Sequence, residues 1–305
     1  MPGRALLTRL AIMLRAPVRD LRGKNVFLTG AASGIGRATA LACAREGAVL
    51  FLTDVNSGGL LAVVEEITDA GGEVAFASPV DVSDHDAVRA MAAEINDQHG
   101  AMDVVMNIAG IASWGTIQGL PHRTWQRVVD VNLMGPIAVL EYLVPPMIEA
   151  RRGGHVVNVS SAAGIIGMPW HAAYSASKFG LRGVSEVLRF DLERHRIGVS
   201  LVCPGGVDTG LTETVDIAGV DNTSPAFRKL QAHFKKRAVS PEAAAEAILR
   251  GVRRNRYWVY TSPDIRVAHL AQRYFPPGYD AAMRIMNRVA NKALPQVRHA
   301  VRDDL

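Results

Sequence analysis

Short apolar runs alternate with helix-forming segments along most of this chain, and this alternation limits the folds that it can adopt. We predict strands at 25–29, 49–53, 73–80, 103–107, 155–160, 199–203 and 257–261. We predict helices at 35–46, 57–70, 83–99, 124–150, 174–195 and 240–254. Strands that alternate with helices form a parallel sheet, and nearly continuous apolar strands indicate that helices cover both of its faces. The pattern therefore predicts an α/β fold with a doubly wound, mostly parallel sheet.

The alternating pattern occupies a single domain, which we place at residues 23–262. A chain of 305 residues could hold one large domain or two small ones, but no linker or internal repeat divides the pattern. Residues 1–22 form a basic N-terminal extension, in which 4–15 are spaced as an amphipathic helix. The sequence leaves open whether that helix lies on a membrane or packs on the domain. Residues 263–305 form a C-terminal helical extension that would close the site, reach a neighbouring subunit or meet a membrane.

Composition and charge exclude several classes of protein. Hydrophobic residues make up 49% and charged residues 21%, which is typical of a globular protein. The net charge of +5 comes with no recognisable nucleic-acid-binding module, so we expect no nucleic-acid partner. The nine histidines and two cysteines lack metal-ligand spacing, so we expect no metal site.

Cysteine use and hydropathy predict a cytoplasmic protein. Cys43 and Cys203 lie in apolar runs, which is typical of buried thiols in a reducing compartment. No run approaches the roughly eighteen apolar residues of a membrane span, so we expect none. Peripheral contact with a membrane through the termini stays open.

A glycine-rich turn follows the first predicted strand and opens the first predicted helix. Gly30, Gly34 and Gly36 are spaced G-x-x-x-G-x-G, with Ser33 and Ile35 between them. Glycines let the chain turn tightly and let a pyrophosphate approach a helix N-terminus, whose free N–H groups favour anions. The turn therefore predicts a Rossmann-type dinucleotide site.

Asp54 ends the second predicted strand, eighteen positions after Gly36. This is close to the roughly twenty positions expected for a carboxylate that binds the adenosine ribose. Such a carboxylate accepts hydrogen bonds from both ribose hydroxyls and repels a 2′-phosphate. We therefore predict NAD rather than NADP as the cofactor, with Arg37 as the one nearby cation that would weaken this preference.

Tyr174 and Lys178 are four residues apart in a predicted helix, so they share a face at about 5–6 Å between Cβ atoms. A neighbouring ammonium favours the phenolate and lowers the tyrosine pKa from its ordinary value of about 10. The pair then predicts a general acid–base that works near neutral pH. An isolated pair of this kind is more typical of an exposed helix surface, so the interpretation depends on the other motifs.

Further motifs follow the glycine turn in a fixed order. They are Asp81-Val82, Asn107-Ile108-Ala109-Gly110, Asn132, Ser161 with Tyr174 and Lys178, and the segment with Pro204, Gly205, Val207 and Thr209. Together with the glycine turn they resemble the short-chain dehydrogenase/reductase family over residues 23–261. Ile108 departs from the family's second asparagine, at a position where backbone shape is the usual role. The family places its serine thirteen residues before the tyrosine, which selects Ser161 rather than Ser160.

The resemblance implies an NAD(P)-dependent oxidoreductase that transfers hydride to and from CH–OH groups. By this resemblance, Tyr174 is the acid–base and Ser161 binds the substrate oxygen. Lys178 lowers the tyrosine pKa and also binds the nicotinamide ribose, and Asn132 holds a water that relays the proton. The resemblance assigns cofactor contacts to Tyr174 and to Asp81, Val82, Asn107, Ala109, Gly110, Pro204, Gly205, Val207 and Thr209. It also implies a lid at about 206–239 and a homodimer or homotetramer.

The substrate is less evident from the sequence. Candidate pocket residues are Trp114, Met168, Trp170, His171 and Leu211. Two tryptophans and a methionine suit a bulky lipophilic alcohol or ketone that is steroid-, retinoid- or lipid-like. The same side chains would equally serve to pack the lid or a subunit contact, and a small polar or sugar-like alcohol is the alternative substrate.

Two other functions compete with the oxidoreductase. Ser175 and Lys178 match the S-x-x-K pattern of serine acyl-enzymes, but the motifs that accompany it elsewhere are missing. A non-catalytic dinucleotide-binding or scaffold protein is the second rival. The combination of Asn132, Ser161, Tyr174 and Lys178 argues against it.

Overall fold

The computed structural model describes residues 18–210, 216–221, 224, 227–228, 231–232, 238–294 and 296–299. The helix predicted at 4–15 and part of the predicted lid lie outside the described residues.

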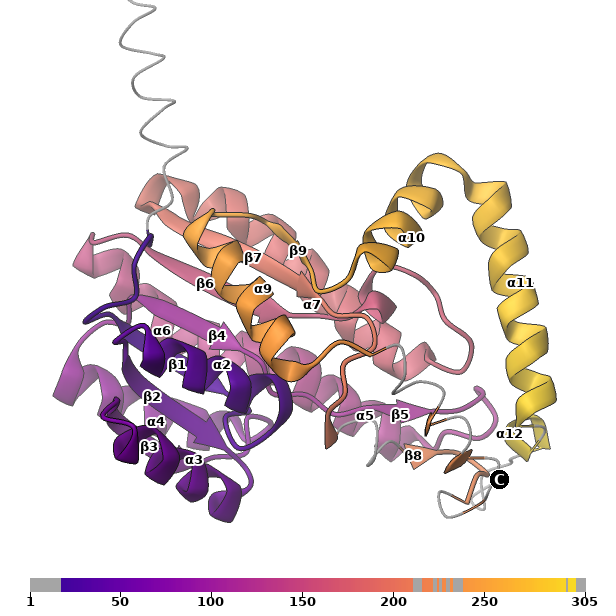
Figure 1. The fold of residues 1–305 in the computed structure, drawn as a ribbon, viewed down its shortest axis with the longest axis horizontal. Coiled ribbons are helices and arrows are strands. Elements are labelled where there is room, and N and C mark those ends of the chain that lie inside the picture. The colour runs from indigo at the N-terminus through magenta and orange to yellow at the C-terminus, as the bar shows by residue number, and fades with distance from the viewer. Residues whose placement is uncertain are drawn as a thin grey trace, which may run out of the picture.

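Seven strands form one parallel sheet in the order β3-β2-β1-β4-β6-β7-β9 (Figure 1). The strands are β1 Asn25–Thr29, β2 Val49–Asp54, β3 Glu73–Pro79, β4 Val104–Asn107, β6 Gly154–Val159, β7 Ile197–Cys203 and β9 Trp258–Tyr260. Every pairing in this sheet is parallel. The strand order reverses between β1 and β4, which confirms the predicted Rossmann-type, doubly wound topology.

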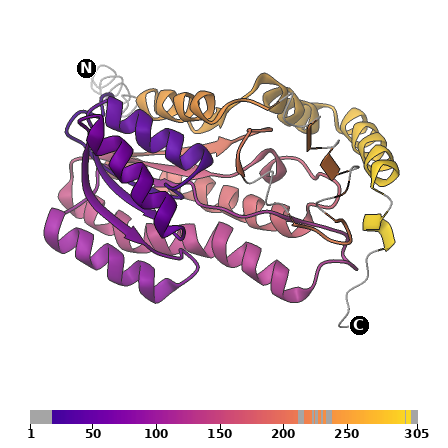
Figure 2. The same ribbon diagram turned by 60° about the horizontal axis from the view of Figure 1, so that its bottom comes forward.

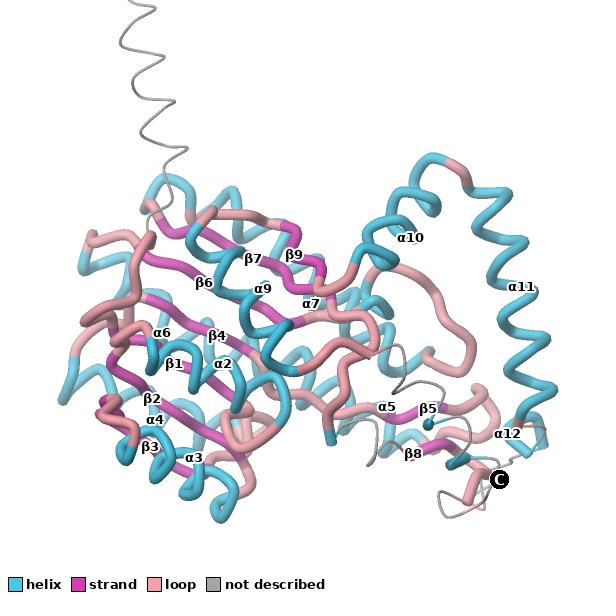
Figure 3. The backbone as a smooth tube through the Cα atoms, in the orientation of Figure 1, coloured by secondary structure: helices cyan, strands magenta, loops and turns pink. Residues whose placement is uncertain are grey.

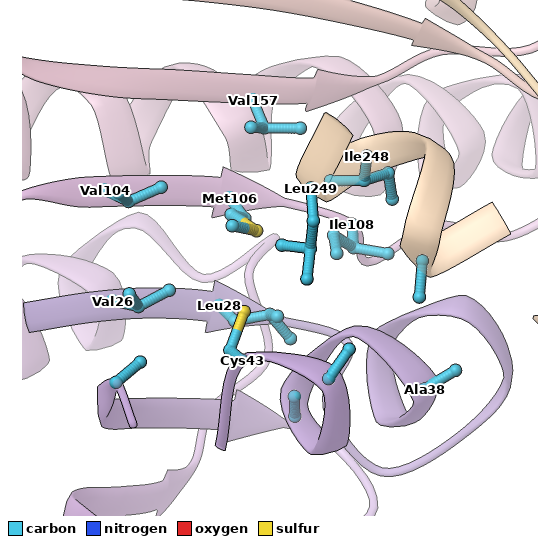
Figure 4. Close-up of a cluster of buried hydrophobic side chains, with 14 of the residues drawn as sticks. Val26, Leu28, Ala38, Cys43, Val104, Met106, Ile108, Val157, Ile248 and Leu249 are labelled. Carbon is cyan, nitrogen blue, oxygen red and sulfur yellow. The ribbon is translucent and has the colours of Figure 1, made fainter. Parts of the chain in front are cut away.

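One face of the sheet packs under three helices. Val26 and Leu28 of β1 point to this face because alternate strand residues share a side. The covering helices are α2 (Gly34–Arg45), α3 (Ser57–Asp69) and α9 (Pro241–Arg253). Figure 4 shows Leu28 on this face together with Ile248 and Leu249 of α9. Cys43 is a buried free thiol in the same cluster, and Cys203 is buried elsewhere in the core, both as predicted.

The opposite face packs under a second set of helices. Phe27 of β1 and Phe51 of β2 point to this side and are fully buried. The helices here are α4 (His85–His99), α6 (Gly135–Ala150) and α7 (Ala172–Asp191). The sheet is therefore covered on both faces, as the continuous apolar strands predicted.

The helix predicted at 124–150 is longer and less regular in the structure. It begins at His122 and consists of α5 (His122–Val129), a π-helical segment (Asp130–Met134) and α6. Such π-helical turns often lie at functional sites, and this one contains Asn132. The stretch His122–Ala150 is long and apolar enough to cross a membrane, but 56% of its most apolar window is buried in the fold, as in the core helix of a globular protein.

After β9 the chain forms α10 (Pro263–Tyr274), α11 (Pro276–Ala293) and α12 (Gln296–His299). In Figures 1 and 3, α10 and α11 are the two legs of a bent arm at the end of the molecule away from α3 and α4. Figure 2 shows α9, α10 and α11 in a row along one side. We call residues 263–293 the C-terminal arm.

Burial of His155 predicts that acid destabilises this fold. His155 Nε2 lies 2.8 Å from Ser200 Oγ, and the Ser200 hydroxyl donates to Arg256 O, so Nε2 carries the proton. Nδ1 is buried without a partner among the described residues, and burial lowers the pKa of His155 to about 3. The unfolded chain binds a proton near pH 6.5 and the fold does not, so stability should fall by about 1.4 kcal/mol per pH unit between about pH 6.5 and pH 3.

Urea unfolding at about pH 6 and pH 5 measures this loss. His155→Gln keeps a donor for Ser200 but does not titrate. The free energy of unfolding of this variant should therefore lack the fall of about 1.4 kcal/mol per pH unit that comes from His155. An equal pH dependence in both proteins would contradict a neutral, buried His155.

Candidate active site

One cavity of about 650 Å³ lies at the C-terminal ends of the strands, beside the reversal of strand order between β1 and β4. Ligands of open α/β sheets bind at such a switch point. The cavity extends from the glycine turn, past Tyr174, to the inner side of α11. Nearly all the predicted site residues that the structure describes line it, and the exceptions are Asn107 and Asn132. Leu211 lies outside the described residues.

The glycine turn has no room for side chains. A Cβ added to Gly36 would lie 1.8 Å from Gly30 O, and one added to Gly30 would lie 2.8 Å from the Ala109 backbone. Gly34, whose φ is +52°, packs against Thr209, and a Cβ added to Gly34 would lie 3.0 Å from the Thr209 side chain. α2 begins at this turn and has no acidic side chain in its first turn. Its free N–H groups and the positive end of its dipole therefore fit a dinucleotide pyrophosphate.

Backbone hydrogen bonds hold Asp54 at the end of β2 on the cavity wall. Asp54 Oδ2 accepts from Ala32 N at 3.0 Å, and Oδ1 accepts from Asn56 N at 2.8 Å. Each oxygen keeps capacity to accept a further hydrogen bond from a ribose hydroxyl. Arg37 donates to Glu66, so the cation that would weaken a preference for NAD is engaged by a carboxylate.

Asn107 does not line the cavity, so its predicted contact with the cofactor stays a prediction. Its side chain is buried and donates to Asn158 Oδ1 at 2.9 Å. The cavity wall here is made by Ile108, Ala109 and Gly110. The N–H groups of Ile108 and Ala109 both donate to Thr29 Oγ1, which joins this segment to the end of β1. Because backbone groups make these bonds, the position of Ile108 does not require the asparagine of the family pattern.

The opposite wall of the cavity comes from the segment after β7. Pro204, Gly205, Val207 and Thr209 all line the cavity from this segment. Asp81 and Val82 follow β3 and line the cavity from the other side of the switch point. Gly205 N donates to Thr261 Oγ1 at 3.3 Å, and an added Cβ at Gly205 would lie 2.9 Å from the Ile265 side chain of α10. The segment is therefore fixed against the beginning of the C-terminal arm.

Ser161, Tyr174 and Lys178 meet in the middle of the cavity. Tyr174 and Lys178 lie on the first turns of α7, and Lys178 Nζ is 5.8 Å from the centre of the Tyr174 ring. A hydrogen bond joins Ser161 to the Tyr174 phenol. The Ser160 hydroxyl instead donates to Lys178 O at 3.0 Å inside the fold. Ser161 is therefore the serine that contacts Tyr174.

The pKa of Tyr174 is raised, and not lowered as the spacing of the pair predicted. Burial favours the neutral phenol, and the hydrogen bond from Ser161 only opposes this. Lys178 Nζ donates to Val159 O at 2.9 Å, and burial lowers the pKa of Lys178 to about 8. The correction has a physical reason: four-residue spacing places the two side chains on one face, but both are buried, and burial disfavours the phenolate and the ammonium.

Asn132 lies behind the cavity wall rather than on it. Its side chain accepts from Ile111 N and donates to Ile111 O, both at 2.9 Å, and donates to Ser177 Oγ at 3.2 Å. A Cβ added to Gly110 would lie 3.0 Å from Asn132 Oδ1 and 3.3 Å from Lys178 Nζ. The amide therefore positions the wall next to Lys178.

The far end of the cavity is apolar and contains the predicted substrate residues. Trp114, Met168, Trp170 and His171 all line it. The Trp114 and His171 rings are 4.4 Å apart, and His171 Nδ1 lies 2.5 Å from Pro169 O. Burial lowers the pKa of His171 to about 4, so the ring is neutral near pH 7.

Two further features shape this end, of which the first was not predicted and the second was one of three alternatives for the C-terminal extension. Trp114 belongs to a short strand, β5 (Ser113–Trp114), which pairs with β8 (Asp216–Ile217) in the lid region. The helix α11 supplies further lining through Met286, Ala290 and Ala293, which repeat at helical spacing along one face. That spacing is visible in the sequence, but the surface against which the face packs is not.

Known proteins share both the sequence pattern and the fold. Residues 24–218 match the family described as short chain dehydrogenase. The chain is 34% identical over 281 residues to the "Probable oxidoreductase EphD" of Mycobacterium tuberculosis, a match that covers 90% of this chain but only 47% of EphD. It is 40% identical over 191 residues to the "3beta-hydroxysteroid dehydrogenase" of Mediterraneibacter gnavus, covering 62% of this chain and 68% of that protein.

A solved structure gives the same result. A short-chain dehydrogenase/reductase from Burkholderia phymatum, crystallised with NAD, superposes with a TM-score of 0.74 at 28% identity, covering 84% of this chain and 96% of that one. This chain spans about half the length of EphD, so it corresponds to one part of that longer protein. The sequence match, the parallel sheet and the cavity at its switch point show that the chain belongs to the short-chain dehydrogenase/reductase family of oxidoreductases.

Proposed function

We propose that this oxidoreductase transfers hydride between NAD and a bulky, lipophilic secondary alcohol or ketone. The observation that carries the proposal is the single cavity that joins the glycine turn, the Ser161–Tyr174 pair and the apolar end. A cofactor bound along the glycine turn would extend toward Tyr174, and a substrate in the apolar end would reach the same phenol.

We assign the roles of the side chains from their contacts and from the family resemblance. Bound NAD supplies the hydride acceptor and a positive charge near the reacting carbon. During alcohol oxidation Tyr174 takes the hydroxyl proton, and Ser161 hydrogen-bonds the substrate oxygen as its charge develops. Lys178 holds the cofactor ribose and passes the proton onward. Asn132 acts on this path through Ile111 and the neighbouring Gly110, as a positioning residue.

We expect alcohol oxidation to speed up as the pH rises. Oxidation needs the Tyr174 phenolate, and burial raises the pKa of Tyr174, so the phenol is protonated near pH 7. Below that pKa the phenolate fraction grows about tenfold per pH unit, and kcat/KM for oxidation should follow it. Ketone reduction uses the protonated phenol and should not show this rise. Profiles of kcat/KM against pH in both directions test the sign, and a flat oxidation profile would contradict it.

The walls of the apolar end favour a lipophilic substrate. Trp114, Met168, Trp170 and Ile166 line it, and the hydroxysteroid dehydrogenase among the relatives acts on a bulky alcohol of this kind. Cavities of roughly 300–1,000 Å³ accommodate drug-sized ligands. A series of secondary alcohols of increasing apolar size, assayed with NAD, tests this proposal. We expect kcat/KM to rise with size until the cavity is filled, whereas faster turnover of small polar or sugar-like alcohols would overturn it.

The preference for NAD rests on Asp54 and on the engagement of Arg37 by Glu66. The carboxylate would repel a 2′-phosphate, and Arg37 is already paired. Similar solved structures include one with NAD and one with NADP, so the proposal depends on the side chains of this chain.

Exposed and buried side chains support our proposals for the assembly and the location of the protein. α7 exposes Phe179, Val187 and Phe190, which supports a homodimer or homotetramer that pairs through this helix. Cys43 and Cys203 are free and buried, which supports the reducing cytoplasm as the location. Sedimentation of the purified protein would measure its oligomeric state.

A further inference from the structure

The C-terminal arm exposes more apolar surface than its length predicts. Six of the thirteen large hydrophobic side chains that the described residues expose lie in these 31 residues. They are Val267, Leu270, Tyr274, Phe275, Ile285 and Val289. Apolar surface gathered in this way on one segment marks a contact surface, since scattered exposure needs no explanation.

Helical spacing puts the exposed side chains of each helix on a continuous stripe. On α10, Val267, Leu270 and Tyr274 lie opposite Ile265 and His269, which are buried against the domain. On α11, Ile285 and Val289 are four residues apart and are 60% and 63% exposed. Both helices therefore carry an apolar stripe that no described part of the chain covers.

The arm is also strongly cationic. Its basic side chains are Arg266, Arg273, Arg284, Arg288 and Lys292, all exposed, and its acids are Asp264 and Asp280. The arm thus has a net charge of +3, more than half of the +5 carried by the whole chain. Within the described ranges none of the five cations forms an ion pair with a carboxylate.

We propose that the C-terminal arm docks this enzyme on an anionic lipid surface. Exposed apolar stripes next to unpaired Arg and Lys side chains are the features by which an amphipathic helix lies in the interface of a membrane. Anionic headgroups attract the cations, and the apolar side chains enter the acyl boundary. A second copy of the arm is a poorer partner because it brings the same charge of +3.

The inner side of the arm connects this surface to the active site. Met286 and Ala290 of α11 line the cavity, and Tyr279 Oη accepts a hydrogen bond from Gly167 N at 2.8 Å. Gly167 lies just before the substrate residues Met168 and Trp170. A lipophilic substrate could therefore enter from the bilayer beside α11. The entry of substrate from the bilayer rests on the proposed function, whereas the docking of the arm on a membrane does not.

Vesicle sedimentation with the purified full chain tests the docking without any assay of activity. We expect the protein to bind vesicles of equal parts phosphatidylglycerol and phosphatidylcholine, to bind phosphatidylcholine vesicles weakly, and to dissociate as the salt concentration rises. The double variant Ile285→Asp with Val289→Asp should lower binding by about tenfold or more, because both charges enter the apolar stripe. Neither side chain lines the cavity.

Leu61→Asp adds one carboxylate where the arm variant adds two, and it serves as the control because Leu61 is 59% exposed on α3, away from the arm. It should bind vesicles as the unchanged protein does, and both variants should oxidise a water-soluble alcohol at the original rate. Equal vesicle binding by the arm variant and the control would overturn the proposal. A second result would also overturn it: the unchanged protein does not bind vesicles, and its oligomer dissociates in the arm variant. The arm would then bind a second copy of the chain. If the unchanged protein oxidised no alcohol, the proposed function would be contradicted, but the result on vesicle binding would still stand.

Discussion

Tyr174→Phe should lower kcat by about a thousandfold, because removal of a positioned acid–base typically costs 10²–10⁴ in rate. The substitution removes the phenolic oxygen, which contacts Ser161 and lines the middle of the cavity. The ring stays, so the packing of Tyr174 against Val128 and Ala163 is kept. Turnover with NAD and the best alcohol of the series measures the effect, and NADH fluorescence measures cofactor affinity, which should change little.

Ser175→Ala separates this mechanism from a serine acyl-enzyme. Ser175 is the serine of the S-x-x-K pattern, but its hydroxyl is buried without a partner among the described residues. We expect Ser175→Ala to keep nearly full activity. Unchanged turnover in Tyr174→Phe, or loss of turnover in Ser175→Ala, would contradict the roles assigned to these side chains.

Asp54→Asn should reverse or strongly weaken the preference for NAD. The carboxylate accepts from Ala32 N and Asn56 N, and it would accept from the ribose hydroxyls as well. Hydrogen bonds to a charged group contribute about 1.5–3 kcal/mol each, so the ratio of kcat/KM for NAD to that for NADP should fall by roughly a hundredfold. Steady-state kinetics with both cofactors measure this ratio.

Glu66→Gln is the companion variant for this prediction. It removes the carboxylate that engages Arg37, so the guanidinium becomes available to a 2′-phosphate. We expect NADP to be used several-fold better, with no loss for NAD. If the ratio of kcat/KM for NAD to that for NADP were unchanged in Asp54→Asn, Asp54 would not determine the choice of cofactor. This holds whatever the result for Glu66→Gln.

Local patterns in the sequence were sufficient for the sheet and for most of the cavity lining. Strands such as β1 alternate between two buried faces, and the glycine turn excludes side chains at Gly30 and Gly36, so both leave clear signals. The helix predicted at 240–254 is found as α9, with Ser240 accepting from Ala243 N and Pro241 at the first helical position, where no donor is needed.

What could not be predicted depends on contacts between distant segments. Asn107 and Asn132 bear the expected amides, but Asn158 and Ile111 engage them inside the fold. The raised pKa of Tyr174 comes from burial, which four-residue spacing does not reveal. The pairing of β5 with β8 joins residues about a hundred positions apart, and the cavity face of α11 depends on how the arm bends.

Transfer of deuterium from the substrate to the cofactor tests the central claim most directly. The full chain would be incubated with NAD and a bulky apolar secondary alcohol that carries deuterium on its carbinol carbon, and the nicotinamide would be examined by mass spectrometry. We predict that the reduced cofactor carries the deuterium, and that Tyr174→Phe forms almost none. Reduced cofactor without deuterium, or no reduced cofactor with any alcohol of the series, would contradict direct hydride transfer at this site.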